Sequence, residues 1–228
     1  MACALVAKHV EFNFVKKNYF NVRASSVIIF MVALMDDPTP IIYFLIEKSN
    51  LKGIKTYPAM SKRIDVLSLL YRCMNSGVSI LPEFRKKVYR HIAESQFEIS
   101  KIYRDAKTFP IAKLEDDGVS HTFFYIGKVR KTLGDALISY RKLANEILLS
   151  PNESYAETAI EVLDETKDFD RPTINFCVNG CLVVPLVGVI PEKVLSRLYN
   201  LRDSMSDESV FYKIAESTIE KVKKVYLE

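Results

Sequence analysis

Histidines beside carboxylates or hydroxyls are the residues of this sequence whose types and spacing suit catalysis. His91 and Glu94 would be neighbours on one helix, and Ser120 directly precedes His121. An acid, a base and a hydroxyl that converge in a fold can support acid–base or nucleophilic chemistry. Neither pair belongs to a recognisable catalytic motif, and a histidine on a helix rich in Lys and Arg is most often a surface group. The sequence therefore favours a non-catalytic protein, with an enzyme of unrecognised site as one alternative.

Metal and cofactor motifs are absent from the sequence. The seven glycines are isolated, so neither a P-loop nor a dinucleotide-binding fingerprint is present. The histidines form no HExxH or HxH spacing, and the cysteines form no paired CxxC spacing of the kind that zinc requires. The Asp36–Asp37 pair precedes Pro38, where aspartate has a structural reason to bond its own backbone in a turn. We therefore expect no metal and no cofactor.

The cysteines and the N-terminus favour a cytoplasmic protein. Residues 1–7 lack the basic region and cleavage site of a secretory signal. Without such a signal, Cys3, Cys73, Cys177 and Cys181 are expected to be reduced thiols. The apolar stretch 27–46 is interrupted by two aspartates and two prolines, which excludes it as a membrane span.

The charge of the chain is distributed unevenly. The 228 residues are 49% apolar and 26% charged, which describes a globular protein and excludes collagen and low-complexity disorder. The net charge is only +4, but residues 84–142 carry thirteen Lys/Arg against seven Asp/Glu, whereas residues 143–170 carry one against eight. The chain can therefore offer one surface to a polyanion and another to a basic partner.

The basic block contains a candidate nucleic-acid interface. On a helix over residues 84–104, Val88, Ile92 and Ile99 share one face, and basic residues with one phenylalanine share the opposite face. Such a surface can follow a phosphate backbone while its ring stacks on a base. We predict binding of single-stranded nucleic acid, RNA in particular, by backbone contacts, as in a small self-assembling viral protein of the nucleocapsid type. The predicted residues are Lys86, Arg90, Phe97, Lys101, Arg104, Lys128, Arg130, Lys131, Arg141 and Lys142.

The acidic block contains a candidate protein-interaction surface. A helix is expected over residues 153–168, because Ser150, Pro151 and Glu153 match a capping box. An acidic helix that meets the basic surface of the next copy would give head-to-tail self-association. The main alternative function is a protein-interaction or regulatory module, such as a host-modulating factor, that docks through this helix. The predicted residues are Glu153, Glu157, Glu161, Asp164 and Glu165.

The elements that must position these residues are predicted to form an α+β fold. The alternation of residues 9–15 and the apolar runs 27–34 and 41–46 predict antiparallel strands near the N-terminus. The pair Asn179–Gly180 between two apolar runs predicts a β-hairpin over residues 174–184. Further strands are expected over 109–113 and 121–126, and helices over 62–74, 83–104, 128–149, 153–168, 191–202 and after 206.

The predicted order of elements also suggests a domain organisation. A boundary is predicted at Ser150–Pro151, where a proline follows a helix. Residues 1–150 would then hold the β-rich start and the basic helical region. Residues 151–228 would hold the acidic helix, the hairpin and the C-terminal helices. A single domain that contains both parts is the alternative.

Overall fold

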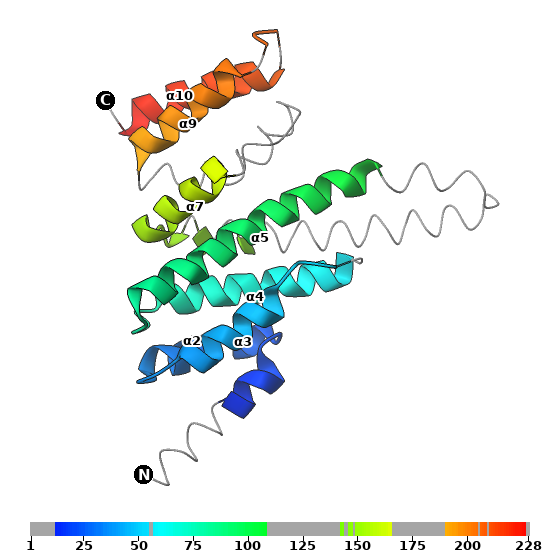
Figure 1. Ribbon diagram of the computed structural model, residues 1–228, viewed down its shortest axis with the longest axis vertical. Helices are drawn as coiled ribbons and strands as arrows, with labels where there is room; N and C mark the ends of the chain where they lie inside the picture. Colours follow the sequence, from blue (N-terminus) through cyan, green and yellow to red (C-terminus); the bar gives the residue numbers. More distant parts are fainter. Residues whose placement is uncertain are drawn as a thin grey trace, which may run out of the picture.

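The computed structural model shows a stack of α-helices. It describes residues 12–54, 57–108, 142–143, 146–147, 149–165, 190–204, 206–208 and 210–226. The described part contains helices, turns and connecting segments and no β-strand. The helices follow one another in chain order along the long axis of the molecule, from the N-terminal helices at one end to α9 and α10 at the other (Figure 1).

The labelled helices have the following bounds. A helical segment at residues 12–18 precedes them. They are the short 3-10 helix η1 (Val22–Ala24), α2 (Ser25–Leu34), α3 (Thr39–Ser49), α4 (Tyr57–Asn75), α5 (Pro82–Thr108), α7 (Glu153–Glu165), α9 (Pro191–Asp203) and α10 (Val210–Tyr226).

Helix α4 occupies the centre of the N-terminal half. It packs against α2 and α3 on one side and against α5 on the other, and α5 in turn packs against α7. Six consecutive residues of α4, from Val66 to Tyr71, are buried, as expected for a helix with neighbours on both sides. Helices α9 and α10 pack against each other.

The predicted α+β class is wrong for the described part of the chain, because two of its expected core strands are helices. Residues 27–34 belong to α2 and residues 41–46 belong to α3, while residues 12–15 of the first expected strand are also helical. Helix α2 is apolar on every face, so its sequence has neither the helical nor the strand period that would separate the two states. Packing on α4 decides the outcome, with Ile28 and Val32 buried one turn apart.

Helix α3 begins where the sequence predicts a turn between strands. Pro40 lies in the first turn of the helix, where its missing N–H costs no hydrogen bond. The Oδ1 of Asp37 accepts a hydrogen bond from the Thr39 N–H at 3.2 Å. Ile41 and Leu45 are fully buried at a spacing of four residues, which is the period of a helix. The turn at residues 36–38 is therefore real, but it connects two helices.

Helix α7 is capped by a residue other than the predicted one. Asn152 accepts a hydrogen bond on Oδ1 from the Tyr155 N–H at 3.1 Å, which is the pattern of an N-cap. The predicted cap, Ser150, instead presents its backbone carbonyl to α4, where it accepts bonds from Tyr71 Oη at 2.8 Å and Asn75 Nδ2 at 3.1 Å. These two bonds fix the entry of α7 against the C-terminal end of α4.

Several predicted helices are confirmed. Residues 62–74 lie within α4, 83–104 lie within α5, 191–202 lie within α9, and α7 covers 153–165 of the expected 153–168. Of the expected helix over 128–149, residues 142, 143, 146, 147 and 149 are helical. The predicted strands at 109–113 and 121–126 and the hairpin at 174–184 lie outside the described residues.

Candidate functional site

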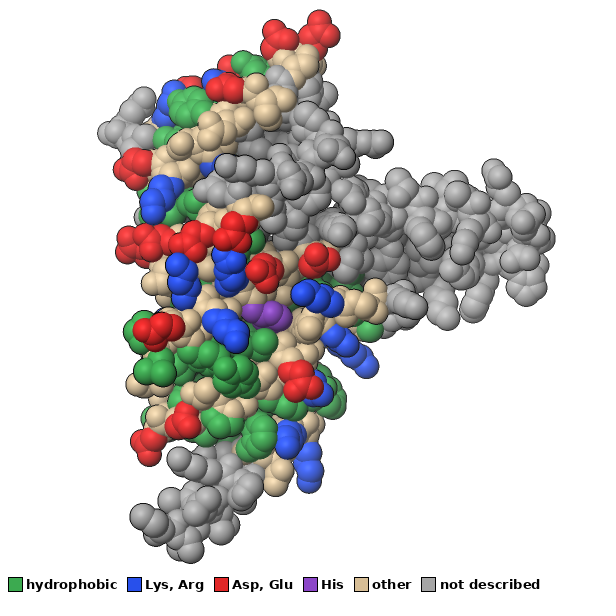
Figure 2. All heavy atoms as spheres, in the orientation of Figure 1, with side chains coloured by type: hydrophobic (Ala, Val, Ile, Leu, Met, Phe, Trp, Pro, Cys, Tyr) green, Lys and Arg blue, Asp and Glu red, His purple; other side chains and the backbone are tan. Residues whose placement is uncertain are grey.

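The predicted basic and acidic surfaces face each other within one chain. Lys86 Nζ lies 3.0 Å from Glu161 Oε1, and Arg90 Nη1 lies 2.8 Å from Glu165 Oε2 with a second bond from Nη2 to Oε1. Figure 2 shows the result as a row of basic side chains directly below a row of acidic ones. Because α5 and α7 pack together, these charges have partners inside the molecule.

A third carboxylate of α7 is paired with the C-terminal helices. Glu157 Oε1 lies 3.3 Å from Lys193 Nζ of α9. Glu153 is exposed in the first turn of α7, and Lys142 Nζ lies 3.8 Å from Asp65 Oδ1 of α4. The structure thus gives intramolecular partners to five of the ten predicted site residues on α5 and α7, and to Lys142 as a sixth. The partly exposed pairs each contribute at most about 1 kcal/mol to stability.

The remaining predicted site residues lie outside the description of the structure. They are the side chains of Phe97, Lys101, Arg104 and Asp164, and the residues Lys128, Arg130, Lys131 and Arg141. Of the two histidines that the sequence offers for catalysis, His121 also lies outside the described residues.

His91 contacts a hydroxyl group on a neighbouring helix. Its Nε2 lies 2.9 Å from Ser49 Oγ, and that hydroxyl also donates a hydrogen bond to the Ile46 carbonyl at 3.0 Å. Since a hydroxyl has one proton, both bonds form together only when Nε2–H donates to Oγ. An imidazole in that state does not activate the serine, and Ser49 has no exposed surface for a substrate to reach. The contact is therefore a structural hydrogen bond that joins α3 to α5.

Burial controls the protonation of His91 and Cys73. Burial and, to a smaller extent, the positive charge of Lys52 together lower the pKa of His91 to about 4. The imidazole is therefore neutral at neutral pH. Cys73 is a free thiol inside α4, and burial raises its pKa to about 12, so it is not a reactive thiolate.

Three buried tyrosines join α4, α5 and α7. The ring of Tyr155 makes edge-to-face contacts with Tyr71 and Tyr89, at centroid distances of 5.2 and 5.7 Å. Tyr155 Oη donates to Gln96 Oε1 at 2.7 Å. Tyr89 Oη, by contrast, is buried and has no hydrogen-bond partner among the described residues. Since Tyr71 Oη donates to the Ser150 carbonyl, the cluster contains two satisfied hydroxyls and one unsatisfied hydroxyl, that of Tyr89.

The hydroxyls of Tyr89 and Tyr155 are expected to contribute to stability with opposite signs. The Tyr89→Phe variant should unfold with a free energy equal to the parent's or up to about 1 kcal/mol higher, because a buried hydroxyl without a partner is costly. The Tyr155→Phe variant should lose about 1–2 kcal/mol, because it breaks the bond to Gln96. Urea denaturation of both variants measures the difference. Equal destabilisation by the two changes would contradict this reading of the cluster.

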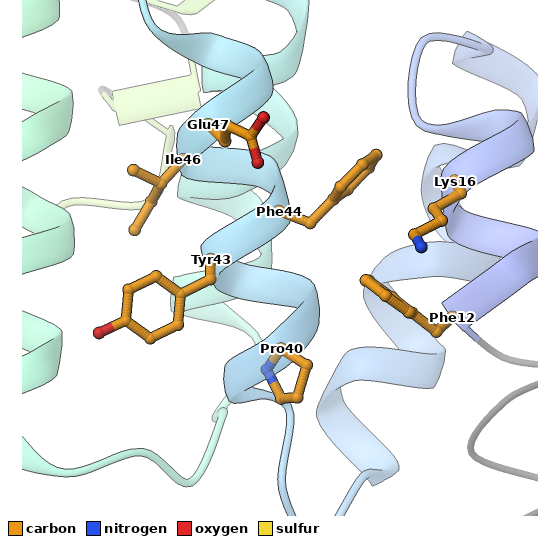
Figure 3. Close-up of a pocket in the computed structure, with 7 residues that line it drawn as sticks. All are labelled: Phe12, Lys16, Pro40, Tyr43, Phe44, Ile46 and Glu47. Carbon is orange, nitrogen blue, oxygen red and sulfur yellow. The ribbon is translucent and has the colours of Figure 1, made fainter.

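A cleft open to solvent lies between the helical segment 12–18 and α3. Its volume is about 530 Å³, and it is lined by Phe12, Lys16, Pro40, Tyr43, Phe44, Ile46 and Glu47. Phe12 and Lys16 project from one helix toward Phe44 on the other, with the cleft between them, whereas Tyr43 projects from another side of α3 (Figure 3). The lining is therefore mainly apolar and includes aromatic rings, one cation and one carboxylate.

Lysines accompany the aromatic rings of this region. Lys16 Nζ lies 4.3 Å from the centroid of the Phe12 ring, and Lys48 Nζ lies 5.4 Å from that of Phe44. Tyr43, which is 49% exposed, has Lys87 Nζ of α5 at 5.9 Å. Three ammonium groups thus lie over or beside aromatic faces, in the geometry of cation–π contacts. Glu47 is the acidic residue of the lining and pairs with Lys48 at 3.7 Å.

Sequence reasoning missed the residues of the cleft, although a signal for them exists. Phe12 and Lys16, and likewise Phe44 and Lys48, are four residues apart. Residues four apart are neighbours on the surface of a helix, so each lysine can lie over its phenylalanine. On a strand the same two residues would be more than about 12 Å apart. The prediction of strands in this region concealed the pattern.

The described part of the chain has neither a metal-ligand cluster nor a membrane-spanning helix. It contains no group of three or more His, Cys, Asp or Glu side chains arranged to hold a metal ion. Within the same residues, no helix combines the length and the apolar character needed to cross a bilayer. Comparisons of the chain with protein-family models, with curated proteins and with solved structures found no match. The function is therefore inferred from the geometry of the described residues.

Proposed function

We propose that this protein is a non-catalytic protein-interaction module, and that its binding site is the cleft between residues 12–18 and α3. Its partner is a protein segment that carries a bulky apolar side chain next to carboxylates. The observation that carries the proposal is the combination of an aromatic-walled cleft with lysines at its aromatic rings. The acidic helix α7, which the sequence offers as a docking surface, has intramolecular partners instead.

The walls of the cleft fit an apolar anchor. Phe12, Phe44 and Pro40 provide apolar surface, and a volume of about 530 Å³ exceeds that of any single amino-acid side chain. Interfaces obtain most of their binding energy from a few large side chains that are fully desolvated in such hollows. A leucine or phenylalanine of a partner helix would exchange water contacts for these rings.

The charges around the cleft select an acidic partner. Lys16 and Lys48 lie at the rings of Phe12 and Phe44, which project into the cleft, and Glu47 is the single carboxylate of the lining. The local balance is positive even after the pair Glu47–Lys48 is formed. Complementary charge at an interface raises the association rate and disfavours partners of the wrong sign. Carboxylates that flank the apolar anchor would meet Lys16 and Lys48.

The other hypotheses have less support from the described residues. Nucleic-acid binding by α5 stays a prediction, and its residues Lys86 and Arg90 are already paired with carboxylates of α7. Catalysis would require a reactive group in a hollow, and no described imidazole or cysteine lines the cleft. A binding site for a protein segment is what the arrangement supports best.

The proposal predicts sign-selective peptide binding. The probe is a fluorescein-labelled helical peptide with Leu and Phe at positions i, i+3, i+4 and i+7 and Glu or Asp elsewhere, and its control carries Lys or Arg in place of the acids. The acidic probe should bind at least about tenfold more tightly than the basic one, and Lys16→Glu with Lys48→Glu should remove that preference. Fluorescence anisotropy measures both.

The matched control reverses two lysines far from the cleft. Lys213 and Lys221 are exposed on α10, so Lys213→Glu with Lys221→Glu makes the same change of net charge and should leave acidic-peptide binding unchanged. Equal affinity for the acidic and basic probes would overturn the proposal. So would tight, salt-dependent binding of a single-stranded RNA by a chain that ignores both peptides.

A further inference from the structure

Helix α2 presents an unusual apolar stripe to solvent. Val27, Phe30 and Leu34 follow one another at spacings of three and four residues, and they are 49%, 66% and 69% exposed. The opposite face of the helix buries Ile28 and Val32 toward α4. A helix that is apolar all round normally has neighbours on all sides. The stripe is therefore a surface that lacks a partner within the described part of the chain.

The charges at the two ends of α2 have opposite signs. Arg23 is exposed just before the helix, and Asp36 and Asp37 are exposed just after it. Arg23 precedes Phe30 by seven residues, and Asp37 follows Phe30 by seven. Phe30 is thus the midpoint of a segment with a cation at one end and carboxylates at the other. Two copies of this segment in antiparallel orientation would therefore place the cation of each opposite the carboxylates of the other.

We propose that this stripe binds a second copy of the chain, as an antiparallel pair of α2 helices related by a two-fold axis near Phe30. In that arrangement the apolar stripes cover each other, and Arg23 of each copy faces Asp36 and Asp37 of the other. A two-fold contact is self-complementary by definition, so each favourable ion pair is made twice. The proposal concerns a surface separate from the peptide cleft and does not depend on the function proposed above.

The size of the stripe sets the strength of the pairing. A helix of ten residues is about 15 Å long, which is short for an interface. A contact of this length buries less than the roughly 800 Å² per partner of a standard stable complex. We therefore expect a reversible dimer with a dissociation constant in the micromolar range. The fraction of dimer should then rise with protein concentration.

Sedimentation velocity tests the apolar part of the proposal. Over roughly 1–300 µM, the range in which micromolar dimers form, the full chain should shift from monomer to dimer. Phe30→Asp should remain monomeric throughout, whereas Leu81→Asp, a matched change at another exposed apolar residue, should behave as the parent. Phe30 is exposed, so its substitution leaves the core intact. A parent that stays monomeric at the highest concentration, or a Phe30→Asp variant that still dimerises, would overturn the proposal.

Charge reversal tests the antiparallel geometry. One variant carries Arg23→Glu. The other carries Asp36→Lys with Asp37→Asn, which keeps an oxygen to accept the bond from the Thr39 N–H. Each variant alone should be at least about tenfold weaker in dimerisation, since like charges then meet at both ends. An equimolar mixture should recover dimers, because each variant now complements the other. A mixture no better than the separate variants would contradict the antiparallel pairing.

Discussion

The Tyr155→Ala variant is expected to lose about 3–5 kcal/mol of unfolding free energy, the usual cost of deleting a large buried aromatic side chain. Tyr155 is 1% exposed, and its ring contacts Tyr71 of α4 and Tyr89 of α5. The change also removes the hydrogen bond to Gln96. Because the side chain joins three helices, the surrounding residues cannot fill the cavity by a small movement of one of them.

Urea denaturation monitored by circular dichroism measures this loss, and Tyr43→Ala provides the control. Tyr43 is 49% exposed, so the same substitution there should cost less than about 1.5 kcal/mol. If Tyr155→Ala were no more destabilising than Tyr43→Ala, the packing of α7 against α4 and α5 would be contradicted. The pair of variants separates a core role for Tyr155 from a general effect of removing tyrosine.

The second large effect is a loss of stability in mild acid that depends on His91. Burial lowers the pKa of His91 from the ordinary 6.5 to about 4 in the folded chain. The unfolded chain therefore binds more protons between these two pH values, and protonation there favours unfolding. The contribution of His91 is fully present above pH 6.5 and is lost as the pH falls toward 4. The difference between the two pKa values corresponds to about 3 kcal/mol.

The His91→Gln variant isolates this contribution from the carboxylates that titrate in the same range. Glutamine does not titrate, and its amide group can still donate to Ser49 Oγ. Unfolding free energies of the parent and the variant are compared at intervals from pH 7.5 to pH 4. The difference between them should change by about 1–3 kcal/mol in favour of the variant as the pH falls. Parallel curves for the two proteins would show that His91 is not buried in its neutral form.

The helices that the sequence predicts correctly are those with a polar face. In α5, Val88 and Ile92 are buried while Lys86 and Lys87 are exposed, so the helical period is visible in the sequence itself. Helix α2 lacks that contrast, because Phe30 and Leu34 are as apolar as Ile28 although they face solvent. A run of apolar residues with two apolar faces cannot be distinguished from a buried strand by period. Tertiary packing on α4, which is not local information, decides between them.

The candidate sites divide in the same way. The basic residues of α5 and the acidic residues of α7 are evident from composition, but their mutual contacts depend on the packing of two helices about 75 residues apart in sequence, the separation of Lys86 and Glu161. The cleft is hidden for a different reason. Phe12 and Phe44 come together only if both segments are helices, and both were expected to be strands. Because these two segments were predicted as strands, the cleft could not be predicted from the sequence.

Hydrogen–deuterium exchange with the acidic peptide bound tests the central claim most directly, which is that the cleft between residues 12–18 and α3 binds an acidic protein segment. At saturating peptide, slower exchange should be confined to residues 12–18 and 39–49, with α5 and α7 unchanged. The basic peptide should change neither region. Protection centred on α5 and α7, with none at residues 12–18 and 39–49, would contradict the account.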